Sequence, residues 1–301
     1  MRGLVRILVP LTISLLLAGT VLTLGGVKRS LVFTPLFGAA VVMLLVRFLP
    51  PRLRQENPIA DQPRKELVAS VKPILAFACL YPLLVIPIIV WTRMQPIPIL
   101  PQTSTNWILT WNYAIVAKVL LLGVPTLFLA VRYGGGAKRL GFIGFGHPWL
   151  WFGTLVAAGV DIALSPTWRF ILQHPLPPLG IDAGLVALAF GFAGLPEELL
   201  YRVLLQTRLE LLIGRWQGLA ASSVLFGLMH YPSRYGLVWF GSTGSVASDL
   251  IITLAFDFSI YVSGGLVFGY LWMRFRNAWI NIGGHTVYDA VALIGQAALG
   301  P

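Results

Sequence analysis

Six charged or titratable residues form three short clusters in the C-terminal half of this sequence, and each cluster interrupts a run of apolar residues. The clusters are Glu197, Glu198 and Arg202, then His230, and then His285 and Asp289. An ionised side chain in hydrocarbon costs at least ~2.5–3.5 kcal/mol, so charges kept in apolar helices predict a functional site. Carboxylates and imidazoles are also the side chains that most often transfer protons in enzymes. Together the three clusters contain the parts of a water-activating site.

The first cluster contains two carboxylates with different expected roles. On an α-helix Glu198 and Arg202 are four residues apart and share a face, so they can form an ion pair. Glu197 lies about 100° around the helix axis from Glu198. We therefore expect Arg202 to hold Glu198, while Glu197 remains available for proton transfer.

The other two clusters supply the histidines. His230 closes an apolar helix, whereas His285 and Asp289 are at positions i and i+4 and so lie on one helix face. Each feature also has a structural interpretation, since a lone histidine can bond to a neighbouring helix and an i,i+4 ion pair can merely brace its own helix. Three further charges in apolar runs are expected to be structural: Lys118, Asp161 and Asp257.

The three clusters match an ordered pattern, E-E-x-x-x-R, then F-x-x-x-H, then H-x-x-x-N/D. The matching segments are Glu197 to Arg202, Phe226 to His230, and His285 to Asp289. This pattern resembles the CAAX protease and bacteriocin-processing (CPBP, or Abi) family of intramembrane proteases, and is similar to type II CAAX prenyl endopeptidases. The resemblance covers about residues 183–297 and predicts an intramembrane peptidase.

The resemblance also implies a role for each residue. Glu197 and His230 would activate the attacking water, His285 and Asp289 would stabilise the oxyanion or position the water, and Glu198 and Arg202 would support the site. Two positions depart from the family pattern. Val203 stands where glycine is frequent, and Asp289 stands where asparagine is common. An ionised aspartate cannot donate to an oxyanion, so Asp289 would have to be protonated, orient His285 or bind a metal.

The need for a metal cofactor is open at this level. Glu197, His230 and His285 could form a His₂Glu zinc site, and a divalent metal such as zinc would then be the cofactor. The sequence contains no H-E-x-x-H helix, which is the usual zinc-protease signature.

The composition restricts the kind of protein that must position these residues. Of 301 residues, 57% are hydrophobic and 11% are charged, against about 25% charged in soluble domains. We therefore expect an all-α, polytopic membrane protein in a lipid bilayer. The net charge of +11 would suggest nucleic acid in a soluble domain, but here membrane topology accounts for it, and no nucleic-acid partner is expected. A single cysteine excludes a disulfide framework within the chain.

Apolar runs long enough to span a membrane number about nine, with eight or ten as alternatives. They are 7–25, 31–49, 73–92, 107–131, 149–165, 183–213, 215–231, 247–273 and 277–298. The run 183–213 carries Pro196 in its middle, which predicts a kink just before Glu197. Basic loop residues favour a cytoplasmic N-terminus and a C-terminus on the opposite side of the cell membrane.

The chain is thereby divided into two regions. Residues 1–148 form an N-terminal region of about four helices without an assigned role, and residues 149–301 form the helical protease core. We predict an endopeptidase that hydrolyses a peptide bond of a membrane-associated or lipidated substrate. A non-catalytic scaffold or immunity-type protein of the same fold is one alternative. A proton-coupled transporter is another, although the sequence lacks the internal repeat of many transporters.

Overall fold

The computed structural model describes residues 29–49, 55–94, 118–164, 188–189, 191–192, 194–239 and 246–298, and these ranges contain helices and no β-strand. The N-terminal helices are α2 (Arg29–Arg47), α3 (Arg64–Met94), the π-helical segment η2 (Val119–Gly123), α5 (Val124–Tyr133) and α6 (Pro148–Leu164). The C-terminal helices are α9 (Leu195–Glu197), the π-helical segment η3 (Glu198–Gln206), α10 (Thr207–Ile213), α11 (Arg215–Trp239), α12 (Val246–Phe275) and α13 (Ala278–Ala298). The predicted all-α class is confirmed over these residues.

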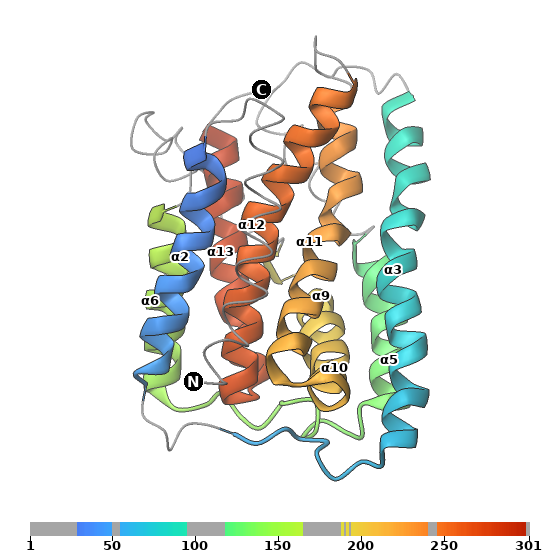
Figure 1. The fold of residues 1–301 in the computed structure, drawn as a ribbon, viewed down its shortest axis with the longest axis vertical. Helices are drawn as coiled ribbons and strands as arrows, with labels where there is room; N and C mark the ends of the chain where they lie inside the picture. The colour runs from blue at the N-terminus through green and yellow to red at the C-terminus, as the bar shows by residue number, and fades with distance from the viewer. Residues whose placement is uncertain are drawn as a thin grey trace.

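The long helices run side by side as a bundle (Figure 1). Helices α3 and α5 form one side and α2 and α6 form the other, with α11, α12 and α13 between them. Helices α11 and α12 approach closely because glycines face the partner helix. A Cβ at Gly265 would lie 3.0 Å from Ser223, and one at Gly227 would lie 2.6 Å from Val262.

Two hydrophobic clusters join the N-terminal helices to the segment that carries the motifs. The first joins α2 and α6 to α12 and α13, with Val42 packed in the same cluster as Leu271. The second joins α3 and η2 to η3 and α11, with Ile74 and Leu122 in the same cluster as Leu200. The N-terminal helices therefore pack directly around the motif-bearing helices.

Most predicted spans coincide with helices, but three differ from the structure. Helix α3 begins at Arg64, nine residues before the predicted start of 73. Helix α11 continues to Trp239, past Pro232, where the prediction ended at 231. The run 183–213 is not one helix with a central proline, as described below. The span 7–25 and the first part of 107–131 lie outside the described residues.

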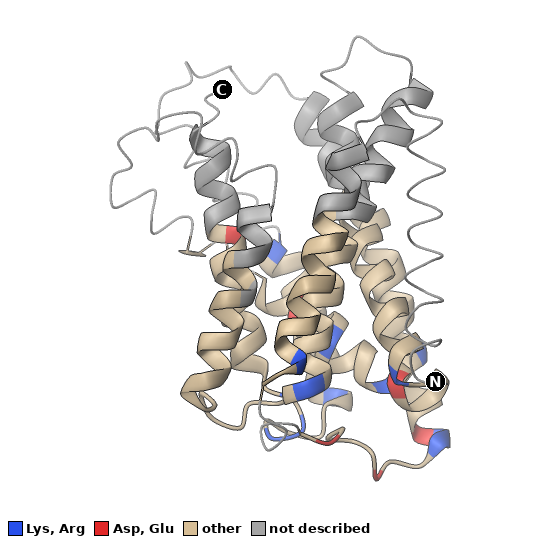
Figure 2. Ribbon diagram, turned by 60° about the vertical axis from the view of Figure 1, so that its left-hand side comes forward, with Lys and Arg blue, Asp and Glu red and all other residues tan. Residues whose placement is uncertain are grey.

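Among the described residues, one helix is long and apolar enough by length and composition to cross a membrane, Arg64–Val85 with 22 residues. Two shorter apolar helices are Pro35–Arg47 and Val119–Tyr133. Most Lys and Arg residues in the described part of the bundle lie toward one end (Figure 2). An uneven distribution of this kind is what the positive-inside rule describes.

Candidate active site

The glutamate pair lies where the helix changes geometry. Helix α9 begins after Gly194 and places Pro196 in its first turn, where the missing amide hydrogen breaks no helical hydrogen bond. From Glu198 to Gln206 the helix is π-helical, and it returns to α-helix at Thr207. The expected kink in the middle of a helix is therefore wrong, because Pro196 starts this helix. Single π-helical turns occur frequently at functional sites.

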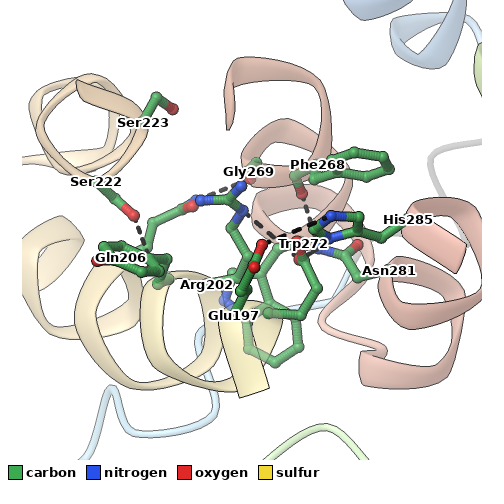
Figure 3. A network of polar contacts seen from close by, with 12 residues as sticks. Glu197, Arg202, Gln206, Ser222, Ser223, Phe268, Gly269, Trp272, Asn281 and His285 are labelled. Carbon is green, nitrogen blue, oxygen red and sulfur yellow. Dashed lines mark hydrogen bonds and ion pairs between the residues drawn. The ribbon is translucent and has the colours of Figure 1, made fainter. Parts of the chain in front are cut away.

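Glu198 is a fully buried carboxylate whose two nearest partners come from α13. Figure 3 shows these partners, His285 and Asn281, close together on that helix. Its Oε1 lies 2.8 Å from His285 Nδ1, and its Oε2 accepts a 2.9 Å hydrogen bond from Asn281 Nδ2. The predicted Glu198–Arg202 pair exists, but it is longer, at 3.5 Å from Nε to Oε2. The nearest partners of Glu198 are thus His285 and Asn281, where the sequence pointed to Arg202. Asn281 precedes His285 by four residues, so their shared helix face could have revealed it.

Glu197 has one oxygen in an ion pair and the other directed at the histidines. Its Oε1 lies 2.6 Å from Lys118 Nζ at the start of η2. Its Oε2 lies 3.8 Å from His230 Nε2 and 3.7 Å from His285 Nε2. Oε2 is buried without a hydrogen-bond partner among the described residues. The expectation that Glu197 has no cation partner is wrong, and Lys118, expected to be structural elsewhere, belongs to this site.

His230 is oriented by its own helix and by a stacked tyrosine. Its Nδ1 lies 2.9 Å from the carbonyl oxygen of Phe226, one turn earlier, so Nδ1–H is the donor and Nε2 faces Glu197. The imidazole is stacked on Tyr261, with ring centroids 3.9 Å apart and planes 9° apart. The F-x-x-x-H spacing thus has a direct structural meaning, because the first residue accepts the hydrogen bond that fixes the tautomer of the last.

His285 is enclosed on both faces and flanked by carboxylates. Its ring stacks on Phe268 at 5.0 Å between centroids. On the side of α9, a Cβ at Gly194 would lie 3.3 Å from ring carbons of His285, so glycine leaves the room that the ring needs. Asp289 Oδ2 lies 3.4 Å from His285 Nε2, as expected for positions i and i+4. Nδ1 faces Glu198, so Nε2 is the nitrogen directed toward Asp289 and Glu197.

Arg202 is fully buried and lies over an aromatic ring. Its guanidinium carbon is 4.2 Å from the centroid of Phe226. Beyond the 3.5 Å approach to Glu198, its side-chain nitrogens have no hydrogen-bond partner in the described part of the chain. Removing such a cation would leave Glu198 with less compensation, so its position supports the electrostatics of the site.

Val203, the departure from the family's glycine, is buried in a cluster with Trp272 and Ile282. A branched side chain there fills space between η3 and the helices α12 and α13. The side chains of Asp161 and Asp257, also expected to be structural, lie outside the described residues.

Glu197, His230 and His285 are the side chains that could together bind a metal ion. No group of three His, Cys, Asp or Glu side chains within the described ranges is arranged to hold a metal ion. Glu197 in addition carries the Lys118 ammonium at 2.6 Å, and a second cation on the same carboxylate would be repelled. As placed here, Glu197, His230 and His285 do not form a zinc site.

The site therefore collects three carboxylates, two histidines, a lysine and an arginine from α9, η3, α11, α13 and the residue that precedes η2. The structure brings together all six residues singled out from the sequence and adds Lys118 and Asn281. An oxygen that accepts protons beside two imidazoles is suited to binding and activating a water molecule.

Comparisons with known proteins agree with this composition. The family model for type II CAAX prenyl endopeptidase Rce1-like proteins matches residues 180–291, a range that holds all three clusters. No curated protein and no solved structure matches the chain. The resemblance predicted from the clusters is confirmed for this segment, which is similar to type II CAAX prenyl endopeptidase Rce1-like proteins.

Proposed function

We propose that this protein is an intramembrane endopeptidase that hydrolyses a peptide bond of a membrane-associated, prenylated or otherwise lipidated substrate. One observation carries the proposal. Glu197 Oε2 is buried, has no hydrogen-bond partner among the described residues, and lies 3.7–3.8 Å from the Nε2 atoms of two histidines. Such separations are too long for direct hydrogen bonds, and we place a bridging water molecule between these polar atoms.

The attacking water is proposed to lie between Glu197 Oε2 and His230 Nε2. His230 Nδ1 donates to the Phe226 carbonyl, so Nε2 presents a lone pair that can accept from this water. Glu197 then removes a water proton as the water oxygen forms a bond to the substrate carbonyl carbon. The hydrogen bond of His230 within its own helix thus fixes which ring nitrogen faces the attacking water.

The oxyanion that forms on the substrate is proposed to be stabilised by His285. Donation from Nε2 requires the doubly protonated ring, because Nδ1 already donates to Glu198. Asp289, 3.4 Å from Nε2, orients the ring without donating to the oxyanion itself. The proton taken by Glu197 passes to the leaving amine as the carbon–nitrogen bond breaks, which balances the reaction and restores the glutamate.

The proposed location in a membrane is supported by the matching family, whose members are membrane proteins, and by the apolar helices of this chain. We propose a multi-pass protein of about nine membrane helices with a cytoplasmic N-terminus. Residues 149–301 would supply the protease core, and residues 1–148 would pack around it. Water has to reach the polar residues through a hydrated path enclosed by protein, because lipid cannot satisfy them.

The test is cleavage by the purified full-length protein in detergent. An internally quenched, prenylated peptide ending in a CAAX sequence is incubated in H₂¹⁸O, and the products are identified by mass spectrometry. The proposal expects one cleavage site with ¹⁸O in the new carboxylate. Cleavage of neither this peptide nor a broad library of lipidated peptides would contradict it and favour a non-catalytic scaffold.

A further inference from the structure

Lys118 is the residue of this site that the family match does not contain. The match covers residues 180–291, and Lys118 comes from the helix that leads into η2. Its Nζ lies 2.6 Å from Glu197 Oε1, and its side chain is 14% exposed. A lysine in an apolar helix is costly, so its retention beside the proposed base requires an explanation.

Packing around η2 brings this lysine to the glutamate. A Cβ at Gly123 would lie 3.4 Å from Pro196 Cγ, which places η2 directly against α9. Leu122 is fully buried in the cluster that also contains Leu200. Both charged residues stand immediately before a π-helical segment, Lys118 before η2 and Glu197 before η3. The Lys118–Glu197 contact therefore lies where both helical segments change from α-helical to π-helical geometry.

The charges at the site explain why a cation is needed there. Three carboxylates lie together, those of Glu197, Glu198 and Asp289, and His285 touches all of them. Arg202 is directed at Glu198, and Lys118 is directed at Glu197. Removing Lys118 would leave Arg202 as the permanent cation at three neighbouring carboxylates, which repel one another.

We propose that Lys118 is a positioning residue for the peptidase reaction. By holding Oε1, it fixes the rotamer of Glu197 so that Oε2, the oxygen without a hydrogen-bond partner among the described residues, points to His230 and His285. The N-terminal region thereby contributes a residue to the site and does more than enclose it. This inference rests on the proposed function, since it assigns Lys118 to the same water-activating step.

The first experiment compares Lys118→Met with Lys118→Arg in the full-length protein, using the quenched prenylated peptide. Misplacing a catalytic group by about 1 Å can cost about 100-fold in rate, so Lys118→Met should lower kcat by about 10- to 100-fold. KM should stay close to the wild-type value, because Lys118 acts through Glu197 and not on the substrate. Lys118→Arg keeps the charge and should recover most of the lost rate.

Arg208→Met is the matched control for loss of a buried cation. Arg208 donates to Ser70 Oγ, to the Leu204 carbonyl and to the Tyr133 carbonyl, and none of these three hydrogen bonds involves Glu197. This variant should lower Tm but keep kcat per folded molecule close to wild type. Equal losses of kcat in Lys118→Met and Arg208→Met, or no rescue by arginine, would overturn the proposal.

A double-mutant cycle of Tm values tests the pairing of Lys118 with Glu197. It applies where Lys118→Met folds poorly or where the wild type cleaves no peptide. Lys118→Met alone should lower Tm, because it leaves the Glu197 charge buried without its cation. The double variant Lys118→Met/Glu197→Gln removes both charges and should recover most of that loss. A double variant no more stable than Lys118→Met would refute the pairing, whereas recovery together with an inactive wild type would contradict the proposed function alone.

Discussion

Glu197 and Glu210 are two buried glutamates on the same helical segment, and their surroundings differ. Both oxygens of Glu210 accept hydrogen bonds from the Arg276 guanidinium, through Nη1 at 3.3 Å to Oε1 and through Nη2 to Oε2. Gln206 Nε2 adds a 2.8 Å bond to Oε1. Glu197 has one oxygen in an ion pair and one without a hydrogen-bond partner in the described ranges. Burial is common to both, so it does not separate structure from catalysis. What separates them is whether every oxygen is satisfied.

The backbone around Arg276 supports this interpretation of Glu210. Arg276 is the one non-glycine residue with positive φ in the described part of the chain, at 48°. A left-handed residue of this kind costs roughly 1–2 kcal/mol. Arg276 adopts this conformation at the junction between α12 and α13, and its guanidinium forms a bidentate pair with Glu210. The Glu210 network thus fastens two helices, whereas the Glu197 site keeps an acceptor available for chemistry.

The largest expected effect is that of Glu197→Gln on activity. Glutamine preserves the shape of the side chain but cannot take a proton, so kcat should fall by about 10²–10⁴-fold. Peptide cleavage by the purified variant measures this. Glu210→Gln is the matched control and should keep most of its kcat per folded molecule. A Glu197→Gln enzyme as active as Glu210→Gln would remove the distinction between the two glutamates.

The loss of thermal stability should be larger in Glu210→Gln than in Glu197→Gln, the reverse of the order expected for the loss of activity. Both variants leave a buried cation without its counter-charge, Arg276 in Glu210→Gln and Lys118 in Glu197→Gln, and breaking a buried ion pair costs about 3–5 kcal/mol. Glu210→Gln also loses the bidentate geometry with Arg276, whereas Glu197→Gln loses a single contact, so the larger cost falls on Glu210→Gln. Thermal unfolding in detergent should therefore show a clearly lower Tm for Glu210→Gln than for Glu197→Gln. If Glu197→Gln is the less stable variant, Glu197 is the residue with the structural role.

Two asparagines near the start of α13 sharpen the comparison at smaller magnitude. Asn281 Nδ2 donates to Glu198 and to the Phe268 carbonyl, and Asn277 bonds to the Gly144 carbonyl and the Ile280 amide. Alanine at either position leaves buried polar groups unsatisfied and should cost about 1–3 kcal/mol. Only Asn281→Ala should also lower kcat, because Glu198 holds His285. Equal kcat values in the two variants would contradict a role for Asn281 in the site.

The smallest expected effect belongs to Asp289→Asn. The Asn Oδ1 atom can still accept a hydrogen bond from His285 Nε2, so orientation of the ring is kept and kcat should change little. Asp289→Ala removes that acceptor and should lower kcat more. Rates of the two variants with the same peptide provide the measurement. Equally large losses of kcat in both variants would contradict this expectation. They would show that the reaction needs the negative charge of Asp289 and not only a hydrogen-bond acceptor at this position.

Much of the site could be predicted because its internal spacings are local. Positions i and i+4 on a helix share a face, which correctly paired Glu198 with Arg202 and His285 with Asp289. The same rule applied to Asn281 and His285 would have found Asn281. Apolar runs likewise located most helices of the described residues, since a continuous apolar run of about 20 residues is typical of a long helix.

The features of the site that the sequence did not predict depend on contacts between distant segments. Lys118 reaches Glu197 only through the packing of η2 against α9, and no spacing in the sequence encodes that contact. The π-helical geometry after Glu197 replaced the kink expected at Pro196. Arg276 and Glu210 are 66 residues apart in the sequence, and their pairing depends on the α12–α13 junction. Local rules therefore predicted pairs within helices, and tertiary packing determined the pairs between them.

The central claim is that Glu197 and His230 act on one water molecule, and a double-mutant cycle tests it most directly. The rates of Glu197→Gln, His230→Ala and the double variant are measured with the same prenylated peptide. Residues that act as a unit are strongly non-additive, so the double variant should be about as slow as the slower single variant. Losses that multiply in the double variant would show that the two residues act independently and would contradict the shared water.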